Sequence, residues 1–164
     1  VGHSMGGMIS QWVAVQWPDL ISALVLVSPT PAGGVPISPE EVPFFEDLYD
    51  DPDQLIGMML HRAPDPGALA RTVKDAAQGS RQAFVSAFET WRTVGFADRL
   101  AELQVPTVVM GGEHEAPLTP ELLQAAVVAL IPGARFELLR GVAHYPQLED
   151  PDTFTERLQR ALGV

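Results

Sequence analysis

The sequence predicts an α/β fold in which a parallel sheet carries helices on both faces. Short apolar runs such as residues 21–27 lack the alternation of a half-exposed strand, which is typical of strands buried in a parallel sheet. Segments of helical periodicity separate these runs, and strands joined through helices form right-handed parallel crossovers. The chain also begins with a G-x-S-x-G pattern at residues 2–6, which is typical of a tight strand-to-helix turn. Its 164 residues suffice for one domain with its own core.

The first elements follow this serine pattern directly. Apolar residues recur at helical spacing after Ser4, and Pro18 ends the predicted helix. Only Val1 is expected to remain of the strand that precedes the serine. Residues 21–27 then predict a buried strand, and the prolines and glycines of residues 29–36 predict an irregular connection.

Residues 38–94 predict a helical insertion. Ser38, Asp51 and Asp65 are each followed by proline, which is typical of a helix N-cap with proline at the first helical position. Ser80 opens a fourth helix in the same way without the proline. We therefore expect four short helices with apolar faces in this segment.

Strands and helices alternate again after the insertion. Residues 106–110 and 135–139 predict strands, and residues 119–131 predict a helix between them. Residues 150–162 predict the last helix, which Asp150 and Pro151 open. The predicted sheet therefore has three strands.

Composition excludes several classes of function. The net charge is −11 and the isoelectric point is about 4.6, so the surface would repel nucleic-acid phosphates and anionic membranes. The absence of cysteine excludes disulfides, thiolate metal sites and a cysteine nucleophile. No metal-ligand cluster or phosphate-binding loop is evident, so we expect no metal and no cofactor. Without an apolar segment of membrane-spanning length or a signal peptide, the expected location is cytoplasmic.

Ser4 is the candidate nucleophile. The start of the following helix directs free N–H groups and positive partial charge toward a developing oxyanion, and the N–H of Met5 is the expected donor. Gly2 and Gly6 are expected to leave room where the turn brings backbone segments together, and Gly7 to let the helix pack closely.

A serine hydroxyl needs a base, and His144 is the candidate. It lies in G-V-A-H-Y-P, just beyond the last predicted strand, and the carboxyl ends of parallel strands are where such sheets place their sites. His3 lies beside the nucleophile and is expected to pack against its neighbours or to line the pocket. His61 falls within a predicted insertion helix, and His114 lies next to a candidate acid.

The acid is expected in the loop after residues 106–110. This loop offers two carboxylates, Glu113 and Glu115, at the carboxyl end of another strand. Either one gives the chain order of serine, acid and histidine, which is the order of the α/β-hydrolases.

The chain resembles the C-terminal half of an α/β-hydrolase of the small esterase, lactonase and haloperoxidase-like type. Three motifs carry the resemblance: G-H-S-M-G-G, V-P-T-V-V-M-G-G-E-H-E and G-V-A-H-Y-P-Q-L-E-D-P. The resemblance implies that Ser4 is the nucleophile and His144 the base. It places Glu115 where the family usually has aspartate, with Glu113 and Asp98 as alternative acids.

The resemblance also implies a domain organisation, a partial α/β-hydrolase fold with a helical cap insertion. Residues 1–30 and 95–164 correspond to the C-terminal half of the core, and residues 31–94 to a helical cap that shapes the acyl or leaving-group pocket. Glu149 matches a position that we expect to brace the histidine loop.

The family has several strands before the serine, so the chain is expected to be a fragment of a larger enzyme. The missing N-terminal half would be a separate polypeptide or a covalently attached part of the parent. A three-stranded sheet would expose a long apolar edge beside Val25 and Val109, which is expected to aggregate or to recruit a partner. The chain alone is expected to have little activity, because the loss of one oxyanion donor costs about 2.7–4 kcal/mol.

The predicted function is hydrolysis of a small-molecule ester or lactone through an acyl-serine intermediate. Perhydrolysis of the haloperoxidase-like kind and C–C bond hydrolysis use the same residues and stay open. A second class of function is ligand binding or sensing on a hydrolase scaffold, with little or no turnover.

Overall fold

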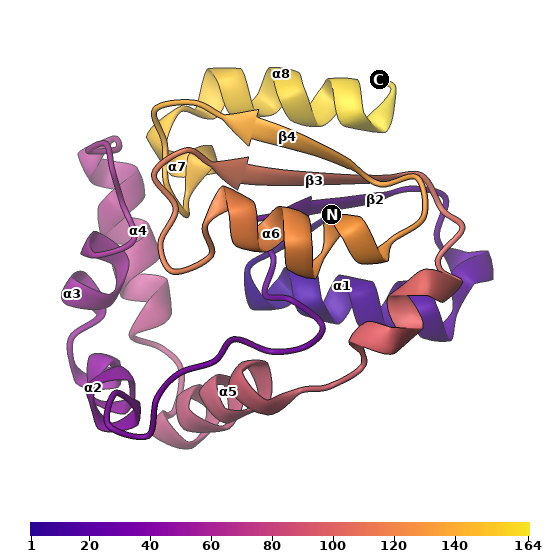
Figure 1. Cartoon of the computed structure of the whole chain (residues 1–164). Coiled ribbons are helices and arrows are strands. Elements are labelled where there is room, and N and C mark those ends of the chain that lie inside the picture. Colours follow the sequence, from indigo (N-terminus) through magenta and orange to yellow (C-terminus); the bar gives the residue numbers. More distant parts are fainter.

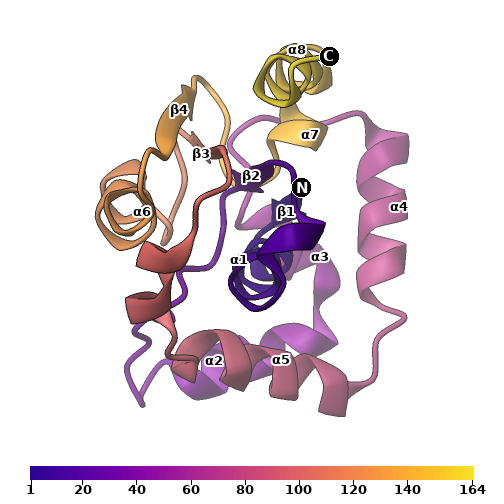
Figure 2. The same ribbon diagram turned by 90° about the vertical axis from the view of Figure 1, so that its right-hand side faces the viewer.

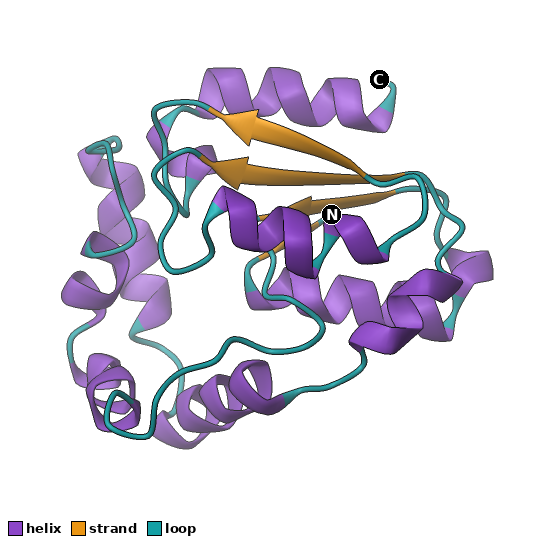
Figure 3. Cartoon of the chain, viewed as in Figure 1, coloured by secondary structure: helices purple, strands orange, loops and turns teal.

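The structure, a computed structural model, describes residues 1–164 and confirms the parallel α/β arrangement. Four strands form one sheet in the order β1 (Gly2–His3), β2 (Leu24–Val27), β3 (Thr107–Gly112) and β4 (Arg135–Leu139). All neighbouring strands are parallel, and Figure 3 shows the long strands side by side between helices. Their carboxyl ends therefore lie at one edge of the sheet.

The sheet has one strand more than predicted. Gly2 pairs with Leu26 and His3 with Val27, so the expectation that only Val1 remains of the elbow strand is wrong. Backbone hydrogen bonding alone makes this short strand, and glycine next to histidine carries none of the β-branched or aromatic pattern that identifies a strand.

Helices cover both faces of the sheet, as Figure 2 shows. Helix α1 (Met5–Gln16), helix α6 (Pro120–Ala126) and the 3₁₀ segment η3 (Ala97–Glu102) pack on one face. Helix α8 (Pro151–Leu162) packs on the other face through Phe154, Leu158 and Ala161. Short 3₁₀ segments at Pro18–Leu20, Leu48–Asp50 and Val128–Leu130 and helix α7 (Pro146–Glu149) complete the connections.

The segment between β2 and β3 contains four helices that lie apart from the sheet. These are α2 (Val42–Asp47), α3 (Pro52–Gly57), α4 (Pro66–Ala76) and α5 (Arg81–Thr93). In Figure 1, α3 and α4 lie beyond the carboxyl ends of the strands, α2 lies below α3 at the lower left, and α5 lies below α1. We call this segment the helical insertion. Its assignment as a separate cap over residues 31–94 stays a prediction.

Three of the predicted helix starts in the insertion are confirmed. The side chain of Asp51 accepts from the backbone N–H of Gln54 at 2.9 Å. Asp65 caps α4 and Ser80 caps α5 in the same way. Each side chain satisfies an N–H group that the first helical turn leaves without a partner.

The helix predicted from Ser38 begins later, at Val42. A helix that started at Pro39 would place Pro43 where the backbone N–H must donate to a carbonyl one turn earlier, and proline has no such N–H. With the start at Val42, Pro43 lies in the first turn, where no donor is needed.

The helix predicted over residues 119–131 is shorter than expected. It ends as α6 at Ala126, because Val127 leaves the helical conformation with φ −129° and ψ −62°. Val127 is fully buried, and adjacent β-branched side chains at Val127 and Val128 disfavour a helix. The last predicted helix is confirmed as α8, with Asp150 as its N-cap.

The predicted edge is wrong for Val109, because β3 pairs with a strand on each side. Beside Val25 it remains in part, because β1 pairs only with Leu26 and Val27. The side chains of Val25 and Val109 are nevertheless buried, at 1% and 0% exposure, because helices cover both faces of the sheet. Five of the eleven large exposed apolar side chains lie in the first twenty residues, at Val1, Ile9, Trp12, Trp17 and Leu20, and the other six are spread over the rest of the chain. None of the helices combines the length and the apolar character that a membrane crossing requires.

Candidate active site

Ser4 lies on a tight turn between β1 and α1. Its backbone has a φ of 53° and a ψ of −125°, a conformation that residues other than glycine rarely adopt. The N–H of Ser4 donates to the carbonyl of Val27 at 3.0 Å, and the carbonyl of Ser4 accepts from the N–H of Thr30 at 3.0 Å. The two bonds attach the turn to the chain at and just beyond the end of β2, and strained backbone held in this way is typical of functional sites.

Two of the three glycines of the turn are needed for packing. A Cβ on Gly2 would collide with Ser10 and with the carbonyl of Gly6, and a Cβ on Gly7 would come within 2.6 Å of Pro29. The expectation for Gly6 is wrong, because a Cβ there would meet no atom within 4 Å. The crowding at the turn therefore comes from the helix passing over Gly2 and against Pro29.

His144 and Glu115 form a buried pair. Nδ1 of His144 lies 2.7 Å from Oε1 of Glu115, and the two side chains are only 6% and 0% exposed. Because an ionised carboxylate only accepts hydrogen bonds, Nδ1 carries the proton and Nε2 keeps a free lone pair. A histidine held in this tautomer can act as a general base.

Ser28 completes the pair, and the sequence reasoning did not identify it. Its hydroxyl donates to Oε2 of Glu115 at 2.6 Å from a fully buried position. Ser28 is the first residue after β2 and has a φ of 41°. Ser28 could have been found by the rule that located Glu115, because it also lies at the carboxyl end of a buried strand.

His3 and Tyr145 surround the base. Nε2 of His3 donates to the carbonyl oxygen of His144 at 2.7 Å, and burial together with the nearby His144 lowers the pKa of His3 to about 4. Burial, and the nearby carboxylate of Glu115, raise the pKa of Tyr145 to about 12. Both rings are therefore neutral near pH 7.

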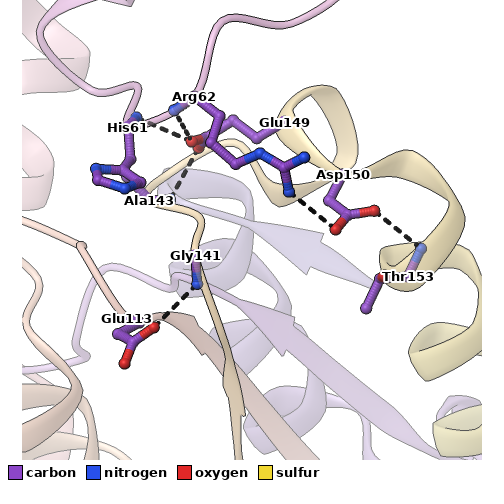
Figure 4. A network of polar contacts seen from close by, with 8 residues as sticks. All are labelled: His61, Arg62, Glu113, Gly141, Ala143, Glu149, Asp150 and Thr153. Carbon is purple, nitrogen blue, oxygen red and sulfur yellow. Dashed lines mark hydrogen bonds and ion pairs between the residues drawn. The ribbon is translucent and has the colours of Figure 1, made fainter.

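Glu149 braces the histidine loop, as expected, and also holds the helical insertion (Figure 4). Its Oε1 accepts from the N–H of Ala143 at 2.9 Å. Its Oε2 accepts from the N–H groups of His61 and Arg62 at 2.9 and 2.8 Å. One buried carboxylate thus binds three backbone donors and joins the insertion to the loop that carries His144.

Two further contacts connect the same parts of the chain. The N–H of His144 donates to the carbonyl of Met59 at 3.1 Å, and the rings of His61 and His114 stack at 3.5 Å between centroids. His61 lies between α3 and α4, not within a helix as predicted, because α3 ends at Gly57. The hydrogen-bond partners of the Glu115 carboxylate are Ser28 and His144, and neither the His61 nor the His114 side chain is among them.

The alternative acids lie elsewhere. Oε2 of Glu113 accepts from the N–H of Gly141 at 3.0 Å, at the exposed base of the histidine loop. Asp98 lies in η3, and its side chain forms no hydrogen bond. The structure pairs His144 with Glu115 and with neither of these.

Ser4 and His144 line one cavity of about 620 Å³ between the carboxyl edge of the sheet and the helical insertion. Fifteen of its 21 lining residues are hydrophobic, so the space suits an apolar ligand. No hydrogen bond joins Ser4 to His144. Met5 is the first residue of α1, so its N–H has no acceptor within the helix. No group of three or more His, Asp or Glu side chains is arranged to hold a metal ion.

The sequence profile described as the Alpha/beta hydrolase family matches residues 1–157. A curated relative, the pimeloyl-(acyl-carrier protein) methyl ester esterase of Klebsiella pneumoniae, is 27% identical over 172 residues. That alignment covers 96% of this chain and 66% of the esterase, so the chain spans slightly under two thirds of that relative.

Solved structures share the fold. An esterase from Exiguobacterium antarcticum superposes with a TM-score of 0.87 at 20% identity, covering 99% of this chain and 65% of that one. The enol-lactonase from Burkholderia xenovorans superposes with a TM-score of 0.80 at 22% identity, covering 99% of this chain and 64% of that one. Both likenesses extend over the sheet and the helical insertion.

Proposed function

Because the chain belongs to the alpha/beta hydrolase family, we propose that it is a serine hydrolase that cleaves a small carboxylic ester or lactone. The observation that carries the proposal is that His144, which is paired with the buried Glu115, lines the same apolar cavity as Ser4. Such an arrangement supplies a nucleophile, a base and an orienting acid in one place.

In the proposed reaction, Oγ of Ser4 attacks the carbonyl carbon of the ester while Nε2 of His144 takes the hydroxyl proton. The C–O bond to the alcohol then breaks, and the alcohol leaves with that proton. A water molecule attacks the acyl-serine, His144 again moves the proton, and the carboxylic acid is released. The N–H of Met5 would donate to the oxyanion in both halves of the reaction.

Glu115 has the role of orienting His144 in this scheme. Its Oε1 keeps the proton on Nδ1, and the carboxylate stabilises the imidazolium that forms when Nε2 is protonated. Glutamate is one methylene longer than the usual aspartate, and the hydrogen bond from Ser28 holds that longer side chain in one position.

We also propose that the helical insertion is the cap of the enzyme. We further propose that residues 1–164 work together with a second polypeptide or as part of a longer parent chain. The exposed apolar side chains on α1 and after it, at Ile9, Trp12, Trp17 and Leu20, would form part of the contact surface. Denaturing mass spectrometry of the protein from its own cells would detect a companion chain or a longer polypeptide. This chain alone in that preparation would contradict the proposal. The cytoplasmic location stays a prediction.

Ligand binding with little turnover is the second candidate, favoured by the lack of a hydrogen bond between Ser4 and His144. Saturable binding without product release would identify it. Perhydrolysis and C–C bond hydrolysis remain within the same chemistry, and a substrate panel with peroxide and diketone members separates them from ester cleavage.

The test of the main proposal is hydrolysis of 4-nitrophenyl butanoate by residues 1–164 together with the companion chain or within the longer parent, compared with the same assembly carrying Ser4→Ala or His144→Gln. Both variants are expected to lose about a thousandfold or more in kcat/KM, because the triad acts as a unit. Circular dichroism should be unchanged. Turnover retained by a folded Ser4→Ala variant would refute the assignment.

A further inference from the structure

The cavity contains almost no polar groups and no cationic one. Among its 21 lining residues only Ser4, Thr30, Glu41 and His144 have polar side chains. Ser4 and His144 belong to the proposed chemistry. None of the lining residues is lysine or arginine, so the cavity offers no positive side chain to pair with a carboxylate.

The wall opposite the sheet is aromatic and closely packed. Phe45 of α2 stacks on Phe88 of α5 at 5.6 Å between centroids, with an interplanar angle of 19°. Trp91 packs edge-on against both rings, at 6.4 and 5.1 Å. Side chains that support one another in this way cannot easily turn aside to admit water around a charged group.

The acidic side chain that lines the cavity, Glu41, lies at its solvent-exposed rim. Its Oε2 accepts from the backbone N–H of Ser38 at 3.0 Å, and the hydrogen bonds from Ser38 lower the pKa of Glu41. No cation lies within ion-pair distance of it. The rim therefore carries a negative charge on a protein that is already acidic.

We propose that this cavity takes a neutral, apolar acyl chain and rejects an acyl chain that ends in a carboxylate. A carboxylate at the far end of the chain would lose water among the aromatic rings and gain no cation in return, which is unfavourable. Glu41 would add a smaller repulsion, because solvent screens its charge at the rim. The proposal rests on the proposed function, since it assumes that the acyl chain fills this cavity.

Three ligands of equal acyl length test the proposal. Methyl octanoate has an apolar end, monomethyl suberate ends in a carboxylate, and dimethyl suberate has the same length without the charge. Their binding to Ser4→Ala, which is proposed to lack turnover, can be measured by isothermal titration calorimetry at pH 8. We expect methyl octanoate to bind at least about tenfold more tightly than monomethyl suberate, and dimethyl suberate to bind within about threefold of methyl octanoate.

Either of two results would overturn it. Monomethyl suberate that binds as tightly as methyl octanoate would show that the cavity accepts the charge. Dimethyl suberate that binds as weakly as monomethyl suberate would show that something other than charge sets the preference.

Two variants examine the cause of the preference. Phe44→Arg places a cation in the wall of the cavity at a side chain that is already 46% exposed, and it should reduce the preference for methyl octanoate about tenfold. Leu162→Arg adds the same charge at a similarly exposed position (41%) outside the cavity and should leave the preference unchanged. Equal effects of the two variants would mean that net charge, and not the cavity wall, discriminates.

Failure of this proposal and failure of the proposed function give different results. If the protein hydrolyses no ester but Ser4→Ala keeps the binding preference, the function fails and the cavity assignment stands. If the protein cleaves monomethyl suberate as efficiently as methyl octanoate, with equal kcat/KM, the function stands and the substrate preference is wrong.

Discussion

The three hydrogen bonds that Glu149 accepts provide the sharpest test of how the helical insertion is attached. Glu149→Gln keeps the shape of the side chain but replaces one oxygen with an NH₂ group, which cannot accept from a backbone N–H. At least one of the three donors, on Ala143, His61 or Arg62, therefore loses its acceptor inside the protein.

The expected loss of stability follows from the number and kind of bonds. A hydrogen bond to a charged group contributes about 1.5–3 kcal/mol and a neutral one about 0.5–1.5 kcal/mol. The variant loses one hydrogen bond, and its other two become bonds to a neutral group. The smaller cost of burying an amide offsets part of this loss, so we expect a net destabilisation of about 3 kcal/mol. For a chain of this length, that corresponds to a fall in Tm of roughly 6–12 °C.

Glu113→Gln is the matched control. Glu113 also accepts a backbone N–H through Oε2, from Gly141 of the same loop, but its side chain is 39% exposed and binds one donor only. We expect Glu113→Gln to change the free energy of unfolding by less than about 0.5 kcal/mol, as measured by urea denaturation. A Glu149→Gln variant as stable as Glu113→Gln would refute the reasoning.

Three further predictions concern the site. Ser4→Gly should be more stable than Ser4→Ala by about 1 kcal/mol in urea denaturation, because glycine relieves the positive φ and alanine does not; equal stability would argue against a strained turn. The pKa of His3, lowered from 6.5 to about 4, means that the unfolded chain binds the proton first as the pH falls. The stability that neutral His3 contributes above pH 6.5 should therefore be lost as the pH falls toward 4, by about 3 kcal/mol. When Tm is measured from pH 7 to 4.5, the Tm of His3→Gln should fall less than the Tm of the unsubstituted protein. Gly112→Ala should lower both Tm and kcat/KM, because a Cβ at this position would collide with carbonyl groups of the histidine loop. Gly95→Ala is the control and should change neither, because a Cβ there would meet no atom within 4 Å. A Gly112→Ala variant with unchanged Tm and kcat/KM would contradict this packing.

The sequence predicted the elements that local signals define. Asp51, Asp65 and Asp150 cap helices as expected, because an N-cap depends only on residues within one turn. The short strand β1 and the late start of α2 were missed. The first depends on pairing with a distant strand, and the second on Pro43, which lies five residues beyond the apparent cap, Ser38.

The sequence also indicated the carboxyl edge of the sheet as the place of the site. That rule identified Glu115 and His144, which the structure brings within 2.7 Å. It missed Ser28, a common residue type with no motif around it, although the residue occupies the same kind of position. The joining of the insertion to the histidine loop through Glu149 was not predictable, because its donors at His61 and Arg62 lie more than eighty residues away in the chain.

The central claim is that Ser4 is a nucleophile activated by His144. Its most direct test is mass spectrometry of the protein after treatment with a fluorophosphonate, which forms a covalent bond with an activated serine. We predict one adduct, on the peptide that contains Ser4, absent in Ser4→Ala and formed much more slowly in His144→Gln. No adduct on the folded protein, or an adduct on another residue, would contradict the assignment.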